Sequence, residues 1–461
     1  MKRDWQGQNV VVIGAARQGL ATSRYLARKS ACVTLTDSRP ASEFDDLSKQ
    51  FSGLQVELFL GSHPFAILDD ADIVCVSGGV PLTIPFIQEA QQRGIPLTND
   101  SQLFMEEVNA KVIGITGSAG KTTTTILTGA IAKAAVEPKV KVWVGGNIGY
   151  PLIEHLEKIQ PQDWVVHEFS SFQLEQMTIS PHIAVITNIT PNHLDRHKTM
   201  QAYTAAKARI LDFQTGQDLA VLNHDDPGSY KLRERAAGSL LTFGFNKPEE
   251  KERGIFLVRD NFKLFDGQND KKLFSVGALR LPGRHNLANA MAACAACHAA
   301  GFPAEAMHTG ISSVQGIPHR LELVREFNGI YWINDSIATA PERVMAAMNS
   351  IKGSLVMLLG GRDKDLPWKD LSAQLHERHP KVVLFGEAEN LIFAALKKYE
   401  GDSPSYPIFE VETLEEAVKK AAEIAEKGDS VLLSPGGTSY DAYRDFEERG
   451  EHFRKLVKAL S

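Results

Sequence analysis

Short apolar runs alternate with helical patterns along the whole chain. The runs include NVVVIG, ACVTLTD, KVIGITG, SLVMLLGG and SVLLSPGG, and each ends in glycine or aspartate. Continuous runs of valine, isoleucine and leucine are typical of parallel strands that are buried on both faces of a sheet. The pattern therefore predicts an α/β fold with mainly parallel sheets, in which ligands bind at the carboxyl ends of the strands.

The 461 residues leave room for about three domains of ordinary size. The first predicted domain, residues 1–106, ends in the polar stretch NDSQLFMEE. The second, residues 107–315, contains the loop GITGSAGKTTTT and a charged insertion at residues 246–274 that predicts a peripheral hairpin. The third, residues 316–461, opens near HRLELV and has its own alternation of strand and helix patterns.

Charged residues of both signs are mixed throughout the chain, and the formal net charge is −6. No basic face indicates a nucleic acid or an anionic membrane as partner. No apolar run reaches the length of about 18 residues that a membrane span needs, and the N-terminal stretch MKRDWQGQNVVVIG fits a buried strand. Small molecules are therefore the expected partners.

The four cysteines are too few and too scattered for a disulfide framework, which fits a reducing cytoplasm. Cys294, Cys297 and His298 match the CxxCH pattern of c-type haem attachment. The surrounding stretch NLANAMAACAACHAAG is rich in alanine and predicts one packed helix that ends at Gly301. We interpret these cysteines as structural, and we expect a cytoplasmic location.

The first candidate ligand loop is GAARQG, which follows the first predicted strand. Gly14, Ala16 and Gly19 have the GxGxxG spacing of a dinucleotide site, and Asp37 ends the next predicted strand. Because Ala16 replaces the middle glycine, it hinders close approach of a pyrophosphate. The residues thus favour a nucleotide or nucleotide-sugar site over a nicotinamide enzyme.

The second candidate loop is GITGSAGKTTTT, between a predicted strand and a predicted helix. Its glycines let backbone N–H groups approach phosphate oxygens, Lys121 supplies a cation, and Thr122 supplies a hydroxyl for Mg²⁺. The strict phosphate-loop pattern fails at Ile115, since the nearest glycine is Gly114. We still predict a phosphate site, because the strand–loop–helix context is the one that the motif requires.

Three further side chains follow or flank later strands. Glu168 ends DWVVHE, where an ordinary P-loop NTPase has an aspartate for Mg²⁺, and we favour a metal ligand over a buried salt-bridge carboxylate. His193, between Asn192 and Asp195, follows HIAVITNIT at the expected ligand edge, although a lone histidine is more often structural. From its helical neighbours alone, Lys207 in YTAAKARI is interpreted as a surface lysine.

Together these motifs resemble the Mur ligases, ATP-dependent amide-forming enzymes of peptidoglycan synthesis. The resemblance runs through GSAGKT, GGNIG, HEFSSFQLE, NHLDRH, YTAAK, LNHDD, PGRHNLANA, GIPHR and NDSIAT, and so covers all three segments. It implies a Rossmann-like UDP-binding domain, a central P-loop ATPase-type domain and a C-terminal Rossmann-like domain. The family's phosphate loop has the form GxxGKT, so Ile115 is normal there.

The resemblance also implies a reaction. ATP phosphorylates the carboxylate of a UDP-sugar-alanine, and the amino group of an amino acid then attacks the acyl phosphate. The short first segment, SSFQLE and the ending LLSPGGTSYDAYRDFEERGEHF are similar to members that join D-glutamate to UDP-N-acetylmuramoyl-L-alanine. The implied catalytic residues are Lys121, His193 and Lys207. Two Mg²⁺ ions are implied at Thr122, Glu168, His193 and Lys207, with Lys207 carbamylated. We expect a monomer.

Ligand contacts are carried over by motif match. For ATP they are Gly117, Ser118, Ala119, Gly120, Lys121, Thr122, Thr123, Asn286, Asn289, Arg320 and Asp335. For the UDP substrate they are Gly14, Arg17, Gln18, Asp37, Ser38, Arg39, Ser77, Gly78, Gly79, Asn147 and Gln173. For the incoming amino acid they are Thr339, Lys364, Ser439 and Phe446.

Two departures from the family pattern affect the amino-acid pocket. Ile337 stands where NDSKAT usually has lysine, and Gly436, Gly437 and Thr438 replace the residues of LSPACAS or LSPANAS. Removing one cation weakens discrimination between carboxylate arrangements, so L-glutamate remains an alternative to D-glutamate. A folylpolyglutamate synthetase is the alternative within the superfamily. A non-enzymatic role is disfavoured because Glu168, His193 and Lys207 are all present.

Overall fold

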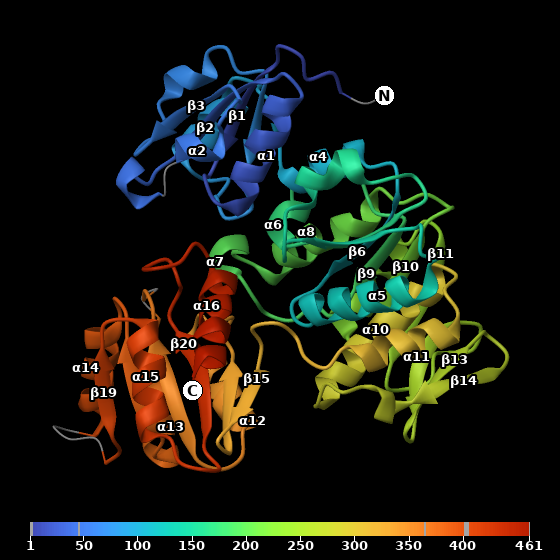
Figure 1. Ribbon diagram of the computed structural model, residues 1–461. Coiled ribbons are helices and arrows are strands. Elements are labelled where there is room, and N and C mark those ends of the chain that lie inside the picture. Colours follow the sequence, from blue (N-terminus) through green and yellow to red (C-terminus); the bar gives the residue numbers. More distant parts are fainter. Residues whose placement is uncertain (1–2, 45–46, 364–365, 401–404, 461) are drawn as a thin grey trace. The chain divides into compact units, whose positions relative to one another are not determined.

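Three β-sheets with flanking helices make up the protein (Figure 1). This computed structural model describes residues 3–44, 47–363, 366–400 and 405–460. The chain divides into two compact units, Met1–Gln315 and Gly316–Ser461, and the first unit contains two of the sheets. The predicted α/β class with mainly parallel sheets is confirmed. Within the described ranges, no helix combines the length and the apolar composition that crossing a membrane requires.

The N-terminal sheet has five parallel strands in the order β3-β2-β1-β4-β5. Its strands are β1 (Asn9–Ile13), β2 (Cys32–Asp37), β3 (Val56–Leu60), β4 (Ile73–Val76) and β5 (Leu97–Thr98). The helices around it are α1 (Arg17–Arg28), η1 (Ala41–Glu43), α2 (Leu47–Gln50), η2 (Phe65–Leu68), α3 (Pro85–Gln92) and α4 (Asp100–Glu107). The apolar N-terminal run forms the central strand β1, which fills apolar cores on both faces of the sheet, as predicted.

The central sheet has nine strands in the order β14-β13-β12-β11-β10-β9-β6-β8-β7. The parallel strands are β6 (Lys111–Thr116), β7 (Val142–Gly146), β8 (Trp164–Glu168), β9 (Ile183–Ile186), β10 (Leu219–Asn223), β11 (Ser239–Gly244) and β12 (Gly254–Val258). Strands β13 (Asn261–Phe265) and β14 (Asp270–Ser275) then continue antiparallel to the sheet edge. The charged insertion therefore forms the predicted peripheral hairpin.

Long and short helices surround the central sheet. They are α5 (Lys121–Ala135), η3 (Leu152–Lys158), α6 (Ser171–Leu174), α7 (Leu194–His197), α8 (Met200–Asp212), α9 (Pro227–Tyr230), η4 (Lys231–Arg235), η5 (Val276–Ala278), α10 (Arg284–Ala299) and α11 (Ala304–Ser313). The CxxCH stretch lies in α10, where Cys294 and Cys297 are fully buried. Their interpretation as residues of a packed helix is thus confirmed.

The C-terminal unit contains a six-stranded sheet in the order β15-β16-β20-β17-β18-β19. After the antiparallel pair β15 (Glu322–Phe327) and β16 (Ile330–Asn334), the strands β17 (Leu355–Gly360), β18 (Lys381–Phe385), β19 (Ile408–Val411) and β20 (Ser430–Gly436) are parallel to β16. The helices α12 (Pro341–Ser350), α13 (Lys369–Arg378), α14 (Glu389–Glu400), α15 (Leu414–Ile424) and α16 (Phe446–Ala459) cover it. Separate apolar cores fill its two faces.

Candidate active site

The loop between β6 and α5 has the tight backbone of a phosphate cradle. Gly117 and Gly120 have φ angles of 151° and 82°, which side chains rarely permit. A Cβ on Gly117 would lie 1.9 Å from Thr187 Oγ1, and one on Gly120 would lie 2.2 Å from Asn289 Oδ1. Both positions therefore require glycine, and α5 begins directly behind them with its N–H groups facing the loop.

Two lysines converge on this loop. Lys121 Nζ donates to the carbonyl oxygens of Gly117 at 2.9 Å and Ser118 at 3.1 Å. Lys207 Nζ, on α8, donates to the same Gly117 oxygen at 2.8 Å. Lys207 is 1% exposed, so its interpretation as a surface lysine from local sequence was wrong. The structure instead buries it against the Gly117 carbonyl oxygen of the phosphate loop.

The environment of Lys207 favours its neutral amine. Burial and the charge of Lys121 lower the pKa of Lys207 well below its ordinary range, against the opposing effect of Glu168. The Lys207 Nζ also lies 4.8 Å from the centroid of the Tyr203 ring. Tyr203 in turn donates its hydroxyl to Ser118 Oγ at 3.0 Å. One turn of α8 thus links the lysine to the phosphate loop.

Glu168 ends β8 beside the same loop and is 1% exposed. Its Oε2 accepts from Thr122 Oγ1 at 2.9 Å, and its Oε1 accepts from Asn147 Nδ2 at 2.9 Å. Burial raises the pKa of Glu168, against Lys121 and these two hydrogen bonds. The carboxylate and the Thr122 hydroxyl are oxygen ligands of the kind that Mg²⁺ prefers, so these residues fit the predicted metal.

His193 lies near Tyr203, the residue that donates to Ser118 of the loop. It precedes α7 with a left-handed backbone, φ 54°, and its ring is 6.4 Å from Tyr203 and 5.1 Å from Phe172. Among the described residues, no three histidine, cysteine, aspartate or glutamate side chains gather into a metal site. The protein would thus supply only part of a Mg²⁺ shell, which is usual where substrate phosphates and water complete it.

Sequence reasoning missed two residues of α7. His197 Nε2 is 2.9 Å from Ser171 Oγ, and its ring stacks on Phe172. The Arg196 guanidinium lies 4.3 Å from the Phe172 centroid and donates to the Gly79 carbonyl oxygen at 3.1 Å. The motif NHLDRH contains both residues, but nothing in it shows that they would pack around one phenylalanine.

The predicted UDP end lies at the carboxyl edge of the N-terminal sheet. Asp37 Oδ2 accepts from the Ala15 backbone N–H at 2.7 Å and from Arg39 Nη2 at 2.9 Å. Ser77 Oγ donates to the Gly14 carbonyl oxygen at 3.2 Å. Burial tends to raise the pKa of Asp37, but the hydrogen bonds from Arg39 and Ala15 hold it below its ordinary value. These residues therefore form one connected frame around the first loop.

Gln18, Gly78 and Gln173 lie close together. A Cβ on Gly78 would be 3.7 Å from Gln173 Cγ and 3.8 Å from Gln18 Oε1. Gln173 is fully buried; its Oε1 accepts from the Ser170 N–H at 2.9 Å, and its Nε2 is 3.3 Å from Asp100 Oδ2. The buried Gln173 side chain thus holds the backbone at Ser170, just after the end of β8.

The predicted adenine contacts lie at the start of α10. Asn289 Nδ2 donates to Asn286 Oδ1 at 3.2 Å, and Asn286 Nδ2 donates to the Pro282 carbonyl oxygen at 2.7 Å. Asn289 also lies against Gly120, because its Oδ1 would be 2.2 Å from a Cβ added to that glycine. The asparagine pair is therefore held beside the phosphate loop. The other predicted residues of this unit are placed by their elements: Ala119 in the loop, Thr123 buried in α5, Arg17 at the start of α1 and Ser38 directly after β2.

In the C-terminal unit, predicted residues gather after β16 and β20. Asp335 accepts from Ser434 Oγ at 2.9 Å and from the Leu321 N–H at 3.1 Å. Burial raises the pKa of Asp335 to about 6, although Arg320, the other predicted ATP residue, opposes the shift. Phe446 begins α16 and packs edge-on against His319. Thr339 and Ser439 follow β16 and β20, and Lys364 lies outside the described residues.

The chain matches models of three domains: the Mur ligase MurD-like N-terminal domain at residues 8–99, the Mur ligase middle domain at 115–297, and the Mur ligase glutamate ligase domain at 319–437. A relative from Symbiobacterium thermophilum, named UDP-N-acetylmuramoylalanine–D-glutamate ligase, is 38% identical over 98% of both chains. A relative from Geobacter metallireducens with the same name is 39% identical over 98% of both chains. The chain belongs to the Mur ligase family.

This Mur ligase is therefore an ATP-dependent amide-forming enzyme, and the family resemblance found in its motifs is confirmed. Its fold is also similar to that of UDP-N-acetylmuramate-alanine ligase from Thermotoga maritima. That structure has a TM-score of 0.57 and 18% identity, and the match covers 98% of this chain and 99% of the other. Such a likeness extends the fold assignment to the whole chain.

The glycines that depart from the family pattern have a physical reason in this Mur ligase. Gly436 has φ 76°, and a Cβ there would lie 2.7 Å from the Trp368 ring. A Cβ on Gly437 would lie 2.6 Å from the Gly360 carbonyl oxygen. The loop after β20 can pack closely on the end of β17 only because both residues lack a side chain.

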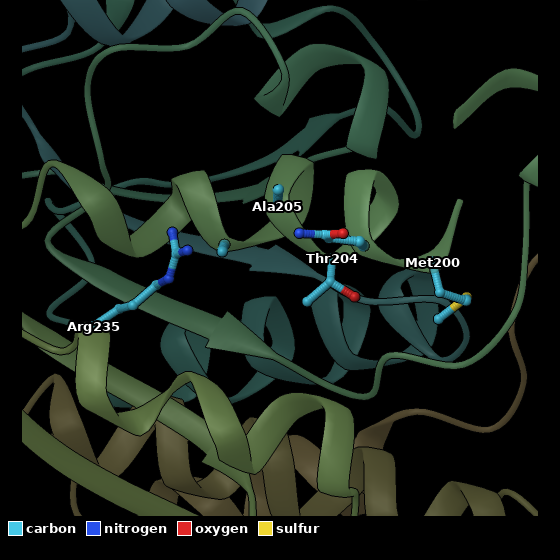
Figure 2. A pocket seen from close by; sticks show the side chains of 6 residues that line it. Met200, Thr204, Ala205 and Arg235 are labelled. Carbon is cyan, nitrogen blue, oxygen red and sulfur yellow. The ribbon is translucent and has the colours of Figure 1, made fainter. Parts of the chain in front are cut away.

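A hollow of about 350 Å³ lies elsewhere on this Mur ligase, between α8 and η4. Figure 2 shows Met200, Thr204 and Ala205 on α8, and Arg235, which comes from η4. None of the residues that line the hollow is among the predicted site residues. Lys207 and Tyr203 lie on a different face of α8, buried toward the phosphate loop, so the hollow is not part of the candidate site.

Proposed function

We propose that this Mur ligase joins D-glutamate to UDP-N-acetylmuramoyl-L-alanine with ATP, in the synthesis of peptidoglycan precursors. The observation that carries the proposal is similarity over the full length to ligases with that name, at 35–39% identity. The substrate-binding N-terminal segment is included, since the MurD-like domain matches residues 8–99. This supports a UDP-sugar acceptor over the folate acceptor of a folylpolyglutamate synthetase.

The phosphate loop and its neighbours have distinct roles in this proposal. Lys121 and the N–H groups at the start of α5 bind and orient the phosphates of ATP. Thr122 and Glu168 hold Mg²⁺, which when bound neutralises charge on the transferring phosphoryl group. His193 holds a second Mg²⁺. Lys121, whose Nζ lies at the Gly117 carbonyl oxygen, supplies positive charge where the phosphates bind.

The reaction then has two steps. An oxygen of the alanine carboxylate attacks the γ-phosphorus of ATP, so that an acyl phosphate forms and ADP leaves. The neutral amino group of glutamate next attacks the acyl carbon, and phosphate leaves as the amide bond forms and the nitrogen loses a proton. Activation is required because a carboxylate is a poor electrophile, and the nucleophilic attack needs the reactants held in line.

Lys207 acts as a carbamate in this proposal. Its neutral amine adds to CO₂ and loses a proton, which converts a cation into an anionic oxygen group that can support the metal. The supporting observation is the burial of Lys207 beside Lys121, because a neutral amine is the form that reacts with CO₂.

The remaining proposals concern organisation. Three domains, residues 1–106, 107–315 and 316–461, bind the UDP substrate, ATP and the amino acid respectively, and the three domain matches support this division. We infer a cytoplasmic enzyme because ATP and UDP-sugars are cytoplasmic. We infer a monomer because one chain carries all the proposed ligand residues.

A panel of amino acids tests the proposal. Phosphate release is measured with ATP, Mg²⁺ and UDP-N-acetylmuramoyl-L-alanine, and the product is identified by mass spectrometry. We expect D-glutamate to give the highest kcat/KM, with the product heavier by one glutamyl residue. Higher kcat/KM with L-glutamate would move the proposal to that enantiomer, and release only with neutral or basic amino acids would contradict it.

A further inference from the structure

A buried arginine lies behind the loops that follow β16 and β20. Arg449, in the first turns of α16, has no exposed surface. Its Nε donates to Ser336 Oγ at 3.1 Å, and its Nη2 donates to the carbonyl oxygens of Ser336 at 3.0 Å and Gly437 at 3.2 Å. Its Nη1 donates to the Thr438 carbonyl oxygen at 2.9 Å. One side chain thus makes four hydrogen bonds to two loops.

The two loops leave adjacent parallel strands, since Tyr331 of β16 pairs with Ser430 of β20. The first loop carries Ser336 and leads to Thr339; the second carries Thr438 and leads to Ser439. Ser336 Oγ also donates to the Phe446 carbonyl oxygen at 2.7 Å. Arg449 and Ser336 therefore join both loops to the start of α16.

The packing around the guanidinium shows that this position is specific. A Cβ on Gly361 would lie 2.7 Å from Arg449 Nη1 and 2.1 Å from the Thr438 carbonyl oxygen. Gly361 has φ 91°, so its backbone also favours glycine. The chain therefore leaves space at the end of β17 for the guanidinium and for the carbonyl group that it binds.

Arg449 is also a buried cation whose hydrogen-bond acceptors are all uncharged. Among the described residues, no carboxylate lies within ion-pair distance of its guanidinium, and its bonded acceptors are neutral oxygens. Burial lowers the pKa of Arg449 to about 10, against the charge of Asp441, so the group remains positive at neutral pH. Burying an unpaired charge is unfavourable, and the planar fork of donors explains why arginine rather than lysine fills this place.

We propose that Arg449 is a positioning residue of the amino-acid site: it holds the loops of Thr339 and Ser439 in register and supplies a fixed positive charge behind them. This rests on the proposed function, in which Thr339 and Ser439 contact the incoming amino acid. An anionic amino acid such as glutamate is the substrate that such a charge favours. The guanidinium acts through the loops, since four of its five N–H donors are used by them.

Arg449→Lys tests the proposal, because lysine keeps the charge and loses the fork. We expect KM for glutamate to rise roughly tenfold to hundredfold, in line with the loss of hydrogen bonds to a charged group. kcat at saturating glutamate should fall less, and KM for UDP-N-acetylmuramoyl-L-alanine should stay unchanged. Ser336→Ala, which removes one hydroxyl, should raise KM for glutamate by a smaller factor in the same direction.

Phe453→Leu is the matched control. Phe453 is fully buried on the same helix and packs in the apolar core rather than on the loops. The Phe453→Leu substitution should lower the melting temperature without changing KM for glutamate. A folded Arg449→Lys with the wild-type KM would overturn the proposal, as would equal increases in KM for glutamate and for the UDP substrate.

Two further outcomes remain decisive. If Arg449→Lys does not fold, Ser336→Ala decides, and an unchanged KM for glutamate in that variant overturns the proposal. If the wild-type enzyme uses another amino acid, the proposed function fails. The KM of each variant relative to the wild type is then measured with that amino acid. An increase in its KM then supports the role of Arg449 independently.

Discussion

Asp37 and Glu168 are both buried carboxylates at the ends of parallel strands, beside a glycine-containing loop and a helix start. Asp37 accepts hydrogen bonds from the Ala15 backbone and from the Arg39 guanidinium. Glu168 accepts from the Thr122 hydroxyl and the Asn147 amide. As a result the pKa of Asp37 is lowered, whereas burial raises the pKa of Glu168.

The difference separates a carboxylate that stabilises a loop from one that can take up a cation. The negative charge of Asp37 is balanced by an adjacent guanidinium, so it can hold the N-terminal loop in shape beside the proposed UDP site. Both oxygens of Glu168 accept hydrogen bonds from neutral donors, and burial of its charge is electrostatically unfavourable. A divalent ion bound at the same place would remove this cost. Similar positions in two sheets therefore have different electrostatic environments.

The largest effect is expected from Lys121→Ala. Removal of this ammonium group takes away a charge that stabilises both the phosphates and ionised Glu168, so turnover should fall by at least about a hundredfold. Phosphate release in steady state measures the loss. Binding of UDP-N-acetylmuramoyl-L-alanine, measured by calorimetry, should remain, and turnover near the wild-type rate would contradict the assignment of the loop.

Lys207→Ala should be nearly as inactive, since it removes the proposed carbamate. Acetate should partly restore its turnover, because acetate supplies a carboxylate in the vacated space, and it should not restore Lys121→Ala. In the wild type, the lowered pKa of Lys207 keeps the amine neutral to lower pH than usual, so activity should fall only as the pH drops through that lowered value. Added bicarbonate should oppose this fall. Absence of bound CO₂ from the active enzyme would exclude the carbamate.

Glu168→Gln preserves shape and removes the charge, so it tests the metal directly. We expect the Mg²⁺ concentration for half-maximal activity to rise about ten- to a hundredfold, as for other weakened metal sites. The titration is carried out at saturating ATP and compared with Asp37→Asn, which should need no more Mg²⁺ than the wild type. Equal Mg²⁺ requirements in both variants would remove the distinction between the two carboxylates.

Asp37→Asn should have the smallest effect, a loss of about 1 kcal/mol of unfolding free energy, because the Arg39 ion pair is partly exposed. The folded-state pKa of Asp37 is lowered, so the stability from its charge is present above its ordinary pKa of 3.8 and is lost as the pH falls through the lowered value. Urea unfolding at pH 7 and at pH 3 checks this. If the difference in unfolding free energy between variant and wild type were larger at pH 3 than at pH 7, the prediction would be contradicted.

The sequence predicted those features that depend on neighbouring residues. The apolar runs predicted the strands, and GSAGKT predicted the phosphate loop, because each pattern is complete within a few residues. Lys207 was different: its helical neighbours are small or apolar, and only the fold brings it to the Gly117 carbonyl, 90 residues away. Its proposed role in the site rests on the family resemblance, not on the local pattern.

Two other features could not be predicted for the same reason. Arg449 sits in a charged, helical stretch, RDFEERGEHF, and its complete burial follows from carbonyl groups on two separate loops, one of them 113 residues away. The glycines at 436 and 437 were recognised as departures, but their cause lies in Trp368 and in the end of β17. Tertiary contacts between separate strands are absent from any local window of sequence.

The fate of one oxygen atom tests the acyl-phosphate account most directly. UDP-N-acetylmuramoyl-L-alanine is labelled with ¹⁸O in its alanine carboxylate, and the phosphate released with D-glutamate and ATP is examined by mass spectrometry. Because the carboxylate oxygen becomes the bridge of the acyl phosphate, we predict one ¹⁸O atom in each phosphate released from doubly labelled carboxylate. Unlabelled phosphate, with the product formed at the same rate, would contradict the account.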